Sequence, residues 1–197
     1  MTFGGFRSII IKLSLNRGQI MKKLILFIWE IIKISIIALI IVIPIRVFVF
    51  QPFFVSGASM EPNFHDYDYL IVDEISYRLG QPHRGDVIIF YSPNDTSKRL
   101  IKRVVGLPEE TIKIFDGQVF VKSEEENFYI LDESEYLSEK TKTAGYVETT
   151  LGEDEYFVLG DNRNVSLDSR SFGPLKRDLI IGRSACRLWP LSVFAGK

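Results

Sequence analysis

The segment TIKIFDGQVFVK, residues 111–122, carries the clearest fold signal in the chain. Ile112 and Ile114 alternate with polar residues on one side of the dipeptide Asp116-Gly117, and two valines alternate in the same way on the other side. A period of two places the four apolar side chains on one face of a pair of strands. Asp-Gly suits a two-residue hairpin turn, because such a turn needs a left-handed backbone at both central positions. The segment therefore predicts an antiparallel hairpin with one buried face.

Short apolar runs of the same kind lie on both sides of this hairpin, and turn residues separate them. The predicted strands are Tyr69–Ile75, Asp86–Tyr91, Leu100–Val105, Thr111–Phe115, Gln118–Lys122, Tyr156–Leu159 and Ile180–Leu188. Many of these runs are rich in Val, Ile, Phe and Tyr, which favour strands. The stretch from Ser123 to Gly145 is instead rich in Glu, Ser and Lys. We expect a mainly β, antiparallel domain in which residues 123–145 form a solvated insertion.

An apolar segment precedes the β region: Leu24–Ile45 reads LILFIWEIIKISIIALIIVIPI. A helix of this length, at about 1.5 Å per residue, crosses a hydrocarbon core of about 30 Å. Only Glu30 and Lys33 interrupt the run, and their spacing of three places them on one helical face, where they can pair. The sequence predicts a single transmembrane helix over residues 24–45.

The charges before this helix predict its orientation. Residues 1–23 contain no acidic residue and five basic ones, namely Arg7, Lys12, Arg17, Lys22 and Lys23. Basic segments next to a span stay in the cytoplasm, so residues 46–197 are expected on the extracytoplasmic side. Met21 offers an alternative start of translation within the basic segment.

Composition argues against several classes of partner. The formal net charge is −1, and the one basic cluster, Lys98–Arg103, is a weak nucleic-acid signal on the outer side of a membrane. A single cysteine, Cys186, excludes an internal disulfide and a cysteine-based zinc site, and we expect it to be a buried small hydrophobe. The two histidines, His65 and His83, lack metal-ligand spacing. We expect no cofactor, no metal and no nucleic-acid partner.

The stretch VSGASMEP, Val55–Pro62, has two opposite interpretations. Its small residues resemble the site at which a secretory signal peptide is cut. A cleavable signal, however, has an apolar region of about 7–15 residues with the cut close behind it. Here the apolar region is longer, and Arg46–Ala58 separates it from the small residues. The alternative is that Ser59 is the nucleophile of an enzyme.

A serine nucleophile needs a base at neutral pH. His65 and His83 lie in no recognisable triad context. A lysine base must be neutral, although at its ordinary pKa only about one lysine in a thousand is neutral near pH 7.4. Strand alternation places Lys102 on one face with Leu100 and Val104, and such an apolar face would lower the pKa of the amine by desolvation. A strand lysine that reaches solvent is the commoner arrangement.

Three segments in sequence order behind the span decide between these interpretations: SGASMEP at 56–62, LIKRVVGLP at 100–108 and GDNRNVSLDSRSFGP at 160–174. They resemble the bacterial type I signal peptidases, and the likeness extends from the span to Pro190. The resemblance implies a serine endopeptidase that removes N-terminal signal peptides from secreted preproteins at the outer face of the bacterial plasma membrane. It implies that Ser59, followed by the family's Met60, is the nucleophile and that Lys102 is the general base.

The resemblance also assigns supporting residues in the third segment. Ser166 is expected to hydrogen-bond and orient the lysine, and Asp168 and Arg170 are expected to form an ion pair. In an extended segment these three side chains share one face.

Substrate specificity follows from the same resemblance. Phe53, Val55, Phe64 and Ile101 are expected to line shallow apolar pockets for the residue just before the cut and the one two positions earlier. Such pockets exclude large side chains, so preproteins with Ala-x-Ala cleavage sites are the expected substrates.

The chain departs from the family pattern at a few positions. It has Glu109-Glu110 where many relatives have Gly-Asp, and Asn164-Val165 where they have Asp-Asn. Gly57 stands where some relatives carry a serine that helps to form the oxyanion hole. The backbone N–H of Ser59 is expected to serve this purpose, and a contribution from Ser56 stays open.

Two further alternatives stay open at this point. The aromatic stretch Val47–Val55 fits either a contact with the phospholipid membrane or an ordinary core strand. A membrane-anchored β module that binds peptides without cutting them would have the same fold, and a specialised Ser/Lys peptidase would process one dedicated partner.

Overall fold

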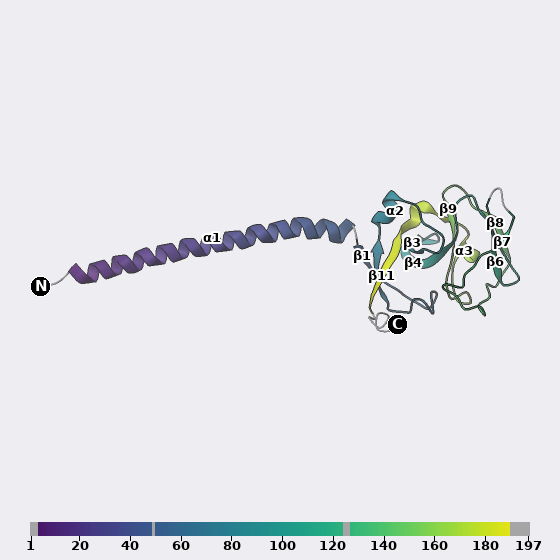
Figure 1. Cartoon of the computed structure of the whole chain (residues 1–197), viewed down its shortest axis with the longest axis horizontal. Coiled ribbons are helices and arrows are strands. Elements are labelled where there is room, and N and C mark those ends of the chain that lie inside the picture. The colour runs from purple at the N-terminus through teal and green to yellow at the C-terminus, as the bar shows by residue number, and fades with distance from the viewer. Residues whose placement is uncertain (1–3, 49, 124–126, 190–197) are drawn as a thin grey trace. The chain divides into compact units, whose positions relative to one another are not determined.

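The computed structural model describes residues 4–48, 50–123 and 127–189, which form two compact units. Figure 1 shows the order of the elements along the chain. The helices are α1 (Gly4–Phe48), α2 (Ile75–Leu79), α3 (Ser169–Phe172) and the 3₁₀ turn η1 (Arg177–Leu179). The strands are β1 (Phe50–Phe54), β2 (Tyr69–Asp73), β3 (Val87–Ser92), β4 (Asp95–Gly106), β5 (Thr111–Phe115), β6 (Gln118–Lys122), β7 (Tyr129–Ile130), β8 (Val147–Thr150), β9 (Glu155–Leu159), β10 (Leu175–Lys176) and β11 (Ile180–Trp189).

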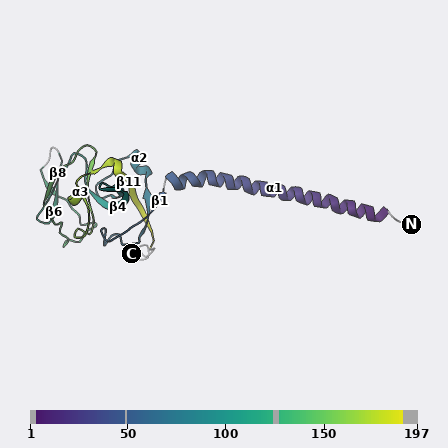
Figure 2. The ribbon, with the colours of Figure 1, turned by 180° about the vertical axis from the view of Figure 1, so that it is seen from behind.

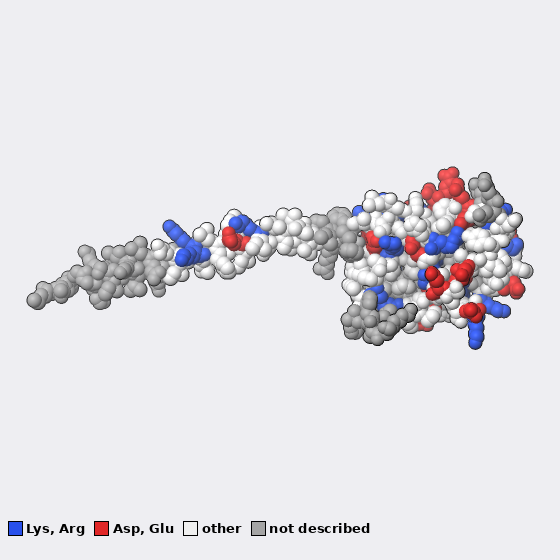
Figure 3. All heavy atoms as spheres, viewed as in Figure 1, with Lys and Arg blue, Asp and Glu red and all other residues white. Residues whose placement is uncertain are grey.

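Helix α1 is the N-terminal unit and contains the predicted span. Its stretch Gln19–Val42 is long and apolar enough to cross a membrane. All side chains in this stretch are exposed, so the large apolar ones have no protein partner. Charges are few along the described part of the helix (Figure 3), and Lys33 pairs with Glu30 at 3.5 Å as expected. An apolar helix without a protein neighbour is typical of a membrane anchor.

The second unit is mainly β, as predicted, and the strand pairs of its described part are antiparallel. Its larger sheet has the order β1-β2-β11-β3-β4-β9-β10, and its smaller sheet has the order β7-β6-β5-β8. In both views, strands β6 and β8 lie at one end of this domain and β1 lies at the other (Figures 1 and 2). The long strand β4 occupies the interior of the larger sheet between β3 and β9, so residues in its middle can be buried from both faces.

The hairpin predicted from TIKIFDGQVFVK is confirmed as β5 and β6. Phe115 pairs with Gln118 across a two-residue turn, in which Asp116 has φ 49° and Gly117 has φ 80°. Both values are left-handed, which is the backbone that such a turn requires. The four alternating Ile and Val side chains are at most 1% exposed and pack against residues of β4 and β9.

The alternation expected in β4 is also confirmed. Val104 and the partly buried Leu100 belong to one apolar cluster with Ile88 and Phe90, whereas Ile101 belongs to another cluster. By the same period, the side chain of Lys102 leaves the strand on the face that carries Leu100 and Val104. Lys102 is 2% exposed, so this side chain lies in the protein interior rather than in solvent.

Some local expectations were wrong. Residue 75 begins helix α2 instead of ending a strand, because the Asp73 carboxylate accepts hydrogen bonds from the N–H and the hydroxyl of Ser76 and turns the chain. Cys186 is exposed and not buried, since register irregularities in β11 on either side of it interrupt the strand's alternation.

The stretch 123–145 is mostly exposed where it is described, but some of its side chains are not, and three of these matter for the site. Thr143 is buried, and Glu133 and Tyr136 are partly buried. Glu133 and Thr143 contact Arg163 of segment 160–174, and the Tyr136 ring contacts Arg103 of β4, as described below.

Candidate active site

Ser59 lies in the loop that joins β1 to β2. The base of this loop is closed by two backbone hydrogen bonds, from Val55 N to Asp68 O at 2.9 Å and from Tyr67 N to Val55 O at 3.0 Å. Met60, the next residue, is fully buried in the apolar cluster of Phe53, whereas Ser59 remains partly exposed. The buried methionine therefore anchors the loop and holds the serine hydroxyl at the surface of the core.

Lys102 projects from β4 to this serine. Its Nζ donates hydrogen bonds to Ser59 Oγ at 2.7 Å and to Ile101 O at 2.7 Å. The residue is 2% exposed. Burial lowers the pKa of the amine from 10.5 to about 8, although the negative charges of Asp168 and Asp161 raise it in part. With a pKa near 8, about one fifth of the amine is neutral at pH 7.4, compared with about one part in a thousand for an ordinary lysine.

The third segment passes directly behind the serine. Asn162 N donates to Ser59 O at 3.0 Å, and Gly160 is buried between Ser59 and Ser166. A Cβ atom added at Gly160 would lie 2.5 Å from Ser59 O. Only glycine lets the two backbones approach this closely.

The expected ion pair between Asp168 and Arg170 forms at 2.8 Å, but the local structure differs from the extended segment that we expected. Asp168 is the N-cap of α3, and its carboxylate accepts from both the backbone N–H and the guanidinium of Arg170. The carboxylate also accepts from Gly160 N at 3.1 Å. Burial raises the pKa of Asp168, yet the bonds from Arg170 and Gly160 outweigh this effect and hold the pKa below its ordinary value. Asp168 is therefore an ionised, buried link between α3 and the segment behind Ser59.

The expected hydrogen bond from Ser166 to the lysine is not formed in this structure. The donors of Lys102 point to Ser59 Oγ and Ile101 O instead. Ser166 Oγ is buried and makes no hydrogen bond of normal geometry to a described residue, although it is close enough to Asp168 to help lower the pKa of that carboxyl.

The loop before the serine fits glycine at position 57. Gly57 has φ 89°, and its N–H donates to the Asp66 carboxylate at 2.8 Å. A positive φ of this size strains any residue with a side chain. Ser56 is exposed at the mouth of the site, next to this turn.

A cavity of about 230 Å³ opens at Ser59 and Lys102. It is lined by Phe53, Phe54, Ser56, Ser59, Arg99, Leu100, Ile101 and Lys102. Of the four residues expected to line substrate pockets, Phe53 and Ile101 line this cavity. Val55 is 2% exposed in the cluster beneath it, and the ring of Phe64 stacks 5.1 Å from the Arg187 guanidinium.

Sequence reasoning missed several residues of this cavity. Arg99 borders it with its guanidinium 5.6 Å from the Phe53 ring centre, and Phe54 is an exposed aromatic at its rim. Arg99 had appeared only as part of a basic cluster. A larger hollow of about 660 Å³ lies between Gly152–Glu155 and Lys176–Asp178, but mostly charged residues line it and it contains none of the candidate site residues.

The predicted membrane-facing stretch is only partly described. Val49 lies outside the described residues. Phe53 is buried in the core, and Phe54 is exposed with its ring 4.7 Å from Tyr69. Phe53 therefore fits the core-strand interpretation, whereas the membrane contact stays a prediction, to which the exposed Phe54 is open.

Comparison with known proteins shows which family the chain belongs to. The family model described as "Signal peptidase, peptidase S26" matches residues 28–189. A probable signal peptidase I-2 of Synechocystis sp. is 37% identical over 168 residues, covering 82% of this chain and 73% of that protein. Signal peptidase I V of Bacillus subtilis is 34% identical over 155 residues, covering 75% of this chain and 91% of that protein.

A solved signal peptidase I from Enterococcus faecalis is also similar. It is 31% identical, with a TM-score of 0.43, and the match covers 53% of this chain and 97% of that one. The family match extends from within helix α1 to the end of β11, and the first of these relatives covers 82% of the chain. The chain therefore belongs to the signal peptidase family of S26 peptidases.

Proposed function

We propose that this chain is a membrane-anchored signal peptidase I in which Ser59 is the nucleophile and Lys102 is the general base. The observation that carries the proposal is the 2.7 Å hydrogen bond between Lys102 Nζ and Ser59 Oγ, made by a lysine that is 2% exposed. Desolvation keeps part of this amine neutral at physiological pH, which a base for a serine hydroxyl requires.

The reaction is an acyl transfer. Neutral Lys102 takes the proton of Ser59 Oγ as this oxygen attacks the carbonyl carbon of the residue before the cut. The resulting ammonium gives its proton to the departing amine of the mature protein, and the signal peptide stays on Ser59 as an ester. Water then attacks the ester with Lys102 again as base. The Ser59 N–H is the proposed donor to the oxyanion.

The free edge of β4 offers a binding site for an extended substrate. Strand β3 pairs with β4 along Arg99–Arg103, whereas β9 pairs with β4 only from Arg103 onward. On the β9 side, residues 99–102 therefore have no strand neighbour within the described part of the chain. A peptide that adds to this edge passes the cavity and brings its carbonyl to Ser59.

The anchor and its charges support a location at the bacterial plasma membrane. Residues 1–23 form the cytoplasmic end, residues 24–45 span the bilayer, and residues 46–197 form the catalytic domain on the outer side. The exposed ring of Phe54 at the rim of the cavity suits contact with the lipid surface. Signal peptide cleavage sites emerge at this surface as preproteins are translocated.

The full-length protein in detergent is expected to cut preproteins after Ala-x-Ala and to reject large residues at either alanine position. Phe53 and Ile101 limit the depth of the cavity, so a leucine or phenylalanine has to displace packed side chains. A misfit of a few methylenes lowers the rate by about 10- to 200-fold. The measurement is a comparison of matched preproteins, with Ala, Leu or Phe at each position, by mass spectrometry of the products.

The Ser59→Ala variant is the control for contaminating peptidases. Efficient cleavage after phenylalanine by the wild-type protein would contradict the pocket assignment. Binding without cleavage of any preprotein would favour the peptide-binding module instead.

The rate is expected to rise with pH through the pKa of Lys102. The neutral amine is the active form, so kcat/KM should fall about tenfold per pH unit below the pKa and level off above it. Because burial lowers this pKa to about 8, the midpoint should lie near pH 8 rather than near 10.5. Measurement of kcat/KM from about pH 6 to about pH 10 tests this. A flat profile, or a midpoint near the ordinary value, would show that the lysine is not desolvated.

A further inference from the structure

Three side chains of the stretch 123–145 contact the segments that carry the proposed catalytic residues. We propose that Glu133, Tyr136 and Thr143, here called the clasp, are positioning residues that hold the nucleophile loop, strand β4 and the third segment together around Ser59 and Lys102. This inference rests on the proposed function.

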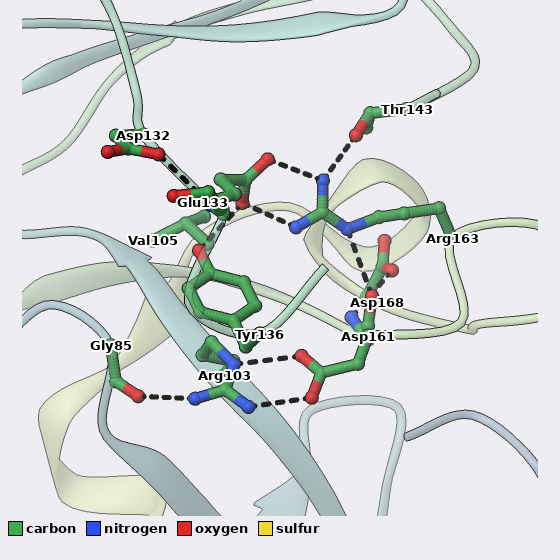
Figure 4. Close-up of polar contacts among 12 residues, drawn as sticks. Gly85, Arg103, Val105, Asp132, Glu133, Tyr136, Thr143, Asp161, Arg163 and Asp168 are labelled. Carbon is green, nitrogen blue, oxygen red and sulfur yellow. Dashed lines mark hydrogen bonds and ion pairs between the residues drawn. The ribbon is translucent and has the colours of Figure 1, made fainter. Parts of the chain in front are cut away.

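The first contact is to the third segment, through Arg163. The Arg163 side chain is 1% exposed, and both of its terminal nitrogens donate to the Glu133 carboxylate, one at 2.9 Å and the other at 2.5 Å. Thr143 Oγ1 accepts from the same guanidinium, and Arg163 Nε donates to Gly160 O at 3.0 Å. Figure 4 shows the guanidinium enclosed by Glu133 and Thr143. The clasp thus fixes Arg163, the residue that directly follows the part of the chain behind Ser59.

The second contact is to β4, at the residue after Lys102. Arg103 donates from Nε and Nη2 to the two oxygens of Asp161, at 2.8 and 2.7 Å. The ring of Tyr136 lies 4.0 Å from the Arg103 guanidinium, and its hydroxyl donates to Glu133 Oε1 at 2.8 Å. In Figure 4 the Tyr136 ring lies between Glu133 and Arg103. A cation held over a ring and paired with a carboxylate has little freedom to move.

The third contact is to the nucleophile loop, through Asn63. The side-chain amide of Asn63 donates to Tyr136 O at 2.7 Å and to Asp161 Oδ2 at 2.8 Å. Asn63 follows Ser59 by four positions in the same loop. The clasp therefore contacts each of the three segments whose relative placement fixes the distance between Ser59 and Lys102.

The arrangement also affects the pKa of Lys102, through the charges around its amine. Two carboxylates, Asp161 and Asp168, raise the pKa of this lysine, and each is paired with an arginine, Arg103 or Arg170. Loss of the Tyr136 ring frees Arg103 to move away from Asp161. The less compensated carboxylate then favours the charged form of Lys102, which is the inactive form of the base.

The test compares Tyr136→Leu, which keeps apolar bulk but removes the aromatic face, with Tyr136→Phe, which keeps the face and loses the hydroxyl. The exposed Glu139, in the same stretch, provides the matched control Glu139→Gln. We expect Tyr136→Leu to lower kcat by about 10- to 100-fold with KM nearly unchanged, since small misplacements of reacting groups cost this much. Its kcat/KM profile should also shift to higher pH. Tyr136→Phe should recover most of kcat, and Glu139→Gln should match the wild type.

Thermal unfolding of each variant separates positioning from stability. Assays are made well below the melting temperature, and if Tyr136→Leu does not fold, Glu133→Gln replaces it in the same comparison. Wild-type kcat and pH midpoint in Tyr136→Leu, or in the Glu133→Gln variant that replaces it, overturn the clasp, as does a loss that only follows the fraction of folded protein. Failure of the wild type to cut any preprotein would instead overturn the proposed function.

Discussion

Replacement of Lys102 with alanine is expected to abolish preprotein cleavage while the protein stays folded. The substitution removes the group that accepts the proton of Ser59 Oγ, and no other basic side chain within hydrogen-bonding distance of this oxygen is described in the structure. We expect a loss of at least about a thousandfold in kcat, within the range measured for nucleophiles and bases that act as one unit. The fold should persist, because the variant removes a buried amine whose desolvation is unfavourable.

Two comparisons make this result specific. Ser59→Ala should lose the same activity, and the double variant should be no worse than either single variant. Lys102→His is expected to be largely inactive too, since a shorter ring does not reproduce the reach of the lysine. The control is Lys98→Ala, which changes an exposed lysine of the same strand that pairs with Asp95. Mass spectrometry of a preprotein assay and a thermal melt measure both outcomes.

Wild-type turnover in Lys102→Ala would remove the proposed dyad. Isolation of a mature protein that begins at Ser59 would instead revive the interpretation of VSGASMEP as a cleavage site.

Features with short-range causes could be predicted from the sequence. The hairpin of β5 and β6 depends on a two-residue turn and on apolar residues that alternate with polar ones within twelve positions, and both features can be recognised in the sequence. The same period placed Lys102 on an apolar face, but a strand lysine that reaches solvent is the commoner arrangement, so its burial was expected only with the help of the family resemblance. The apolar helix was predicted from length and composition alone.

Short strands were harder to predict, because their partners stabilise them. Strand β10 has two residues and exists by pairing with β9, and β7 exists by pairing with β6. Neither has a periodic pattern long enough to read in isolation. Likewise, the Asp168 and Arg170 pair was predicted correctly, but its geometry comes from a helix N-cap that the sequence pattern did not reveal.

Side-chain direction in loops was the main source of error at the site. The resemblance implied that Val55 and Phe64 line the substrate pockets. Val55 instead points into the packed cluster, and the ring of Phe64 contacts Arg187 from β11, more than a hundred positions away. The contact between Glu133 and Arg163 also joins distant segments. A sequence rich in Glu and Ser signals exposure on average and does not show which carboxylate meets a buried arginine.

Gly160→Ala is expected to lose most activity although it adds only one methyl group, because that methyl meets both the Ser166 side chain and the backbone oxygen of Ser59. The added Cβ would lie 2.5 Å from Ser59 O, a distance at which the nucleophile loop or the third segment has to shift. A shift of about 1 Å at reacting groups costs about a hundredfold in rate, and overpacking at a buried site costs about 1–3 kcal/mol of stability.

The matched control is Gly152→Ala, where the nearest atoms to an added Cβ are 3.5 Å away in the flexible Glu155 side chain. This variant should keep both activity and stability, so a simple effect of replacing glycine is excluded. The measurements are kcat/KM for an Ala-x-Ala preprotein and the free energy of unfolding in urea. If Gly160→Ala is as active as Gly152→Ala, the close approach of the third segment does not position the serine. A large loss of kcat/KM with only a modest loss of stability would instead mean that the close packing at Gly160 sets the geometry of the reaction, in addition to the side chains of Ser59 and Lys102.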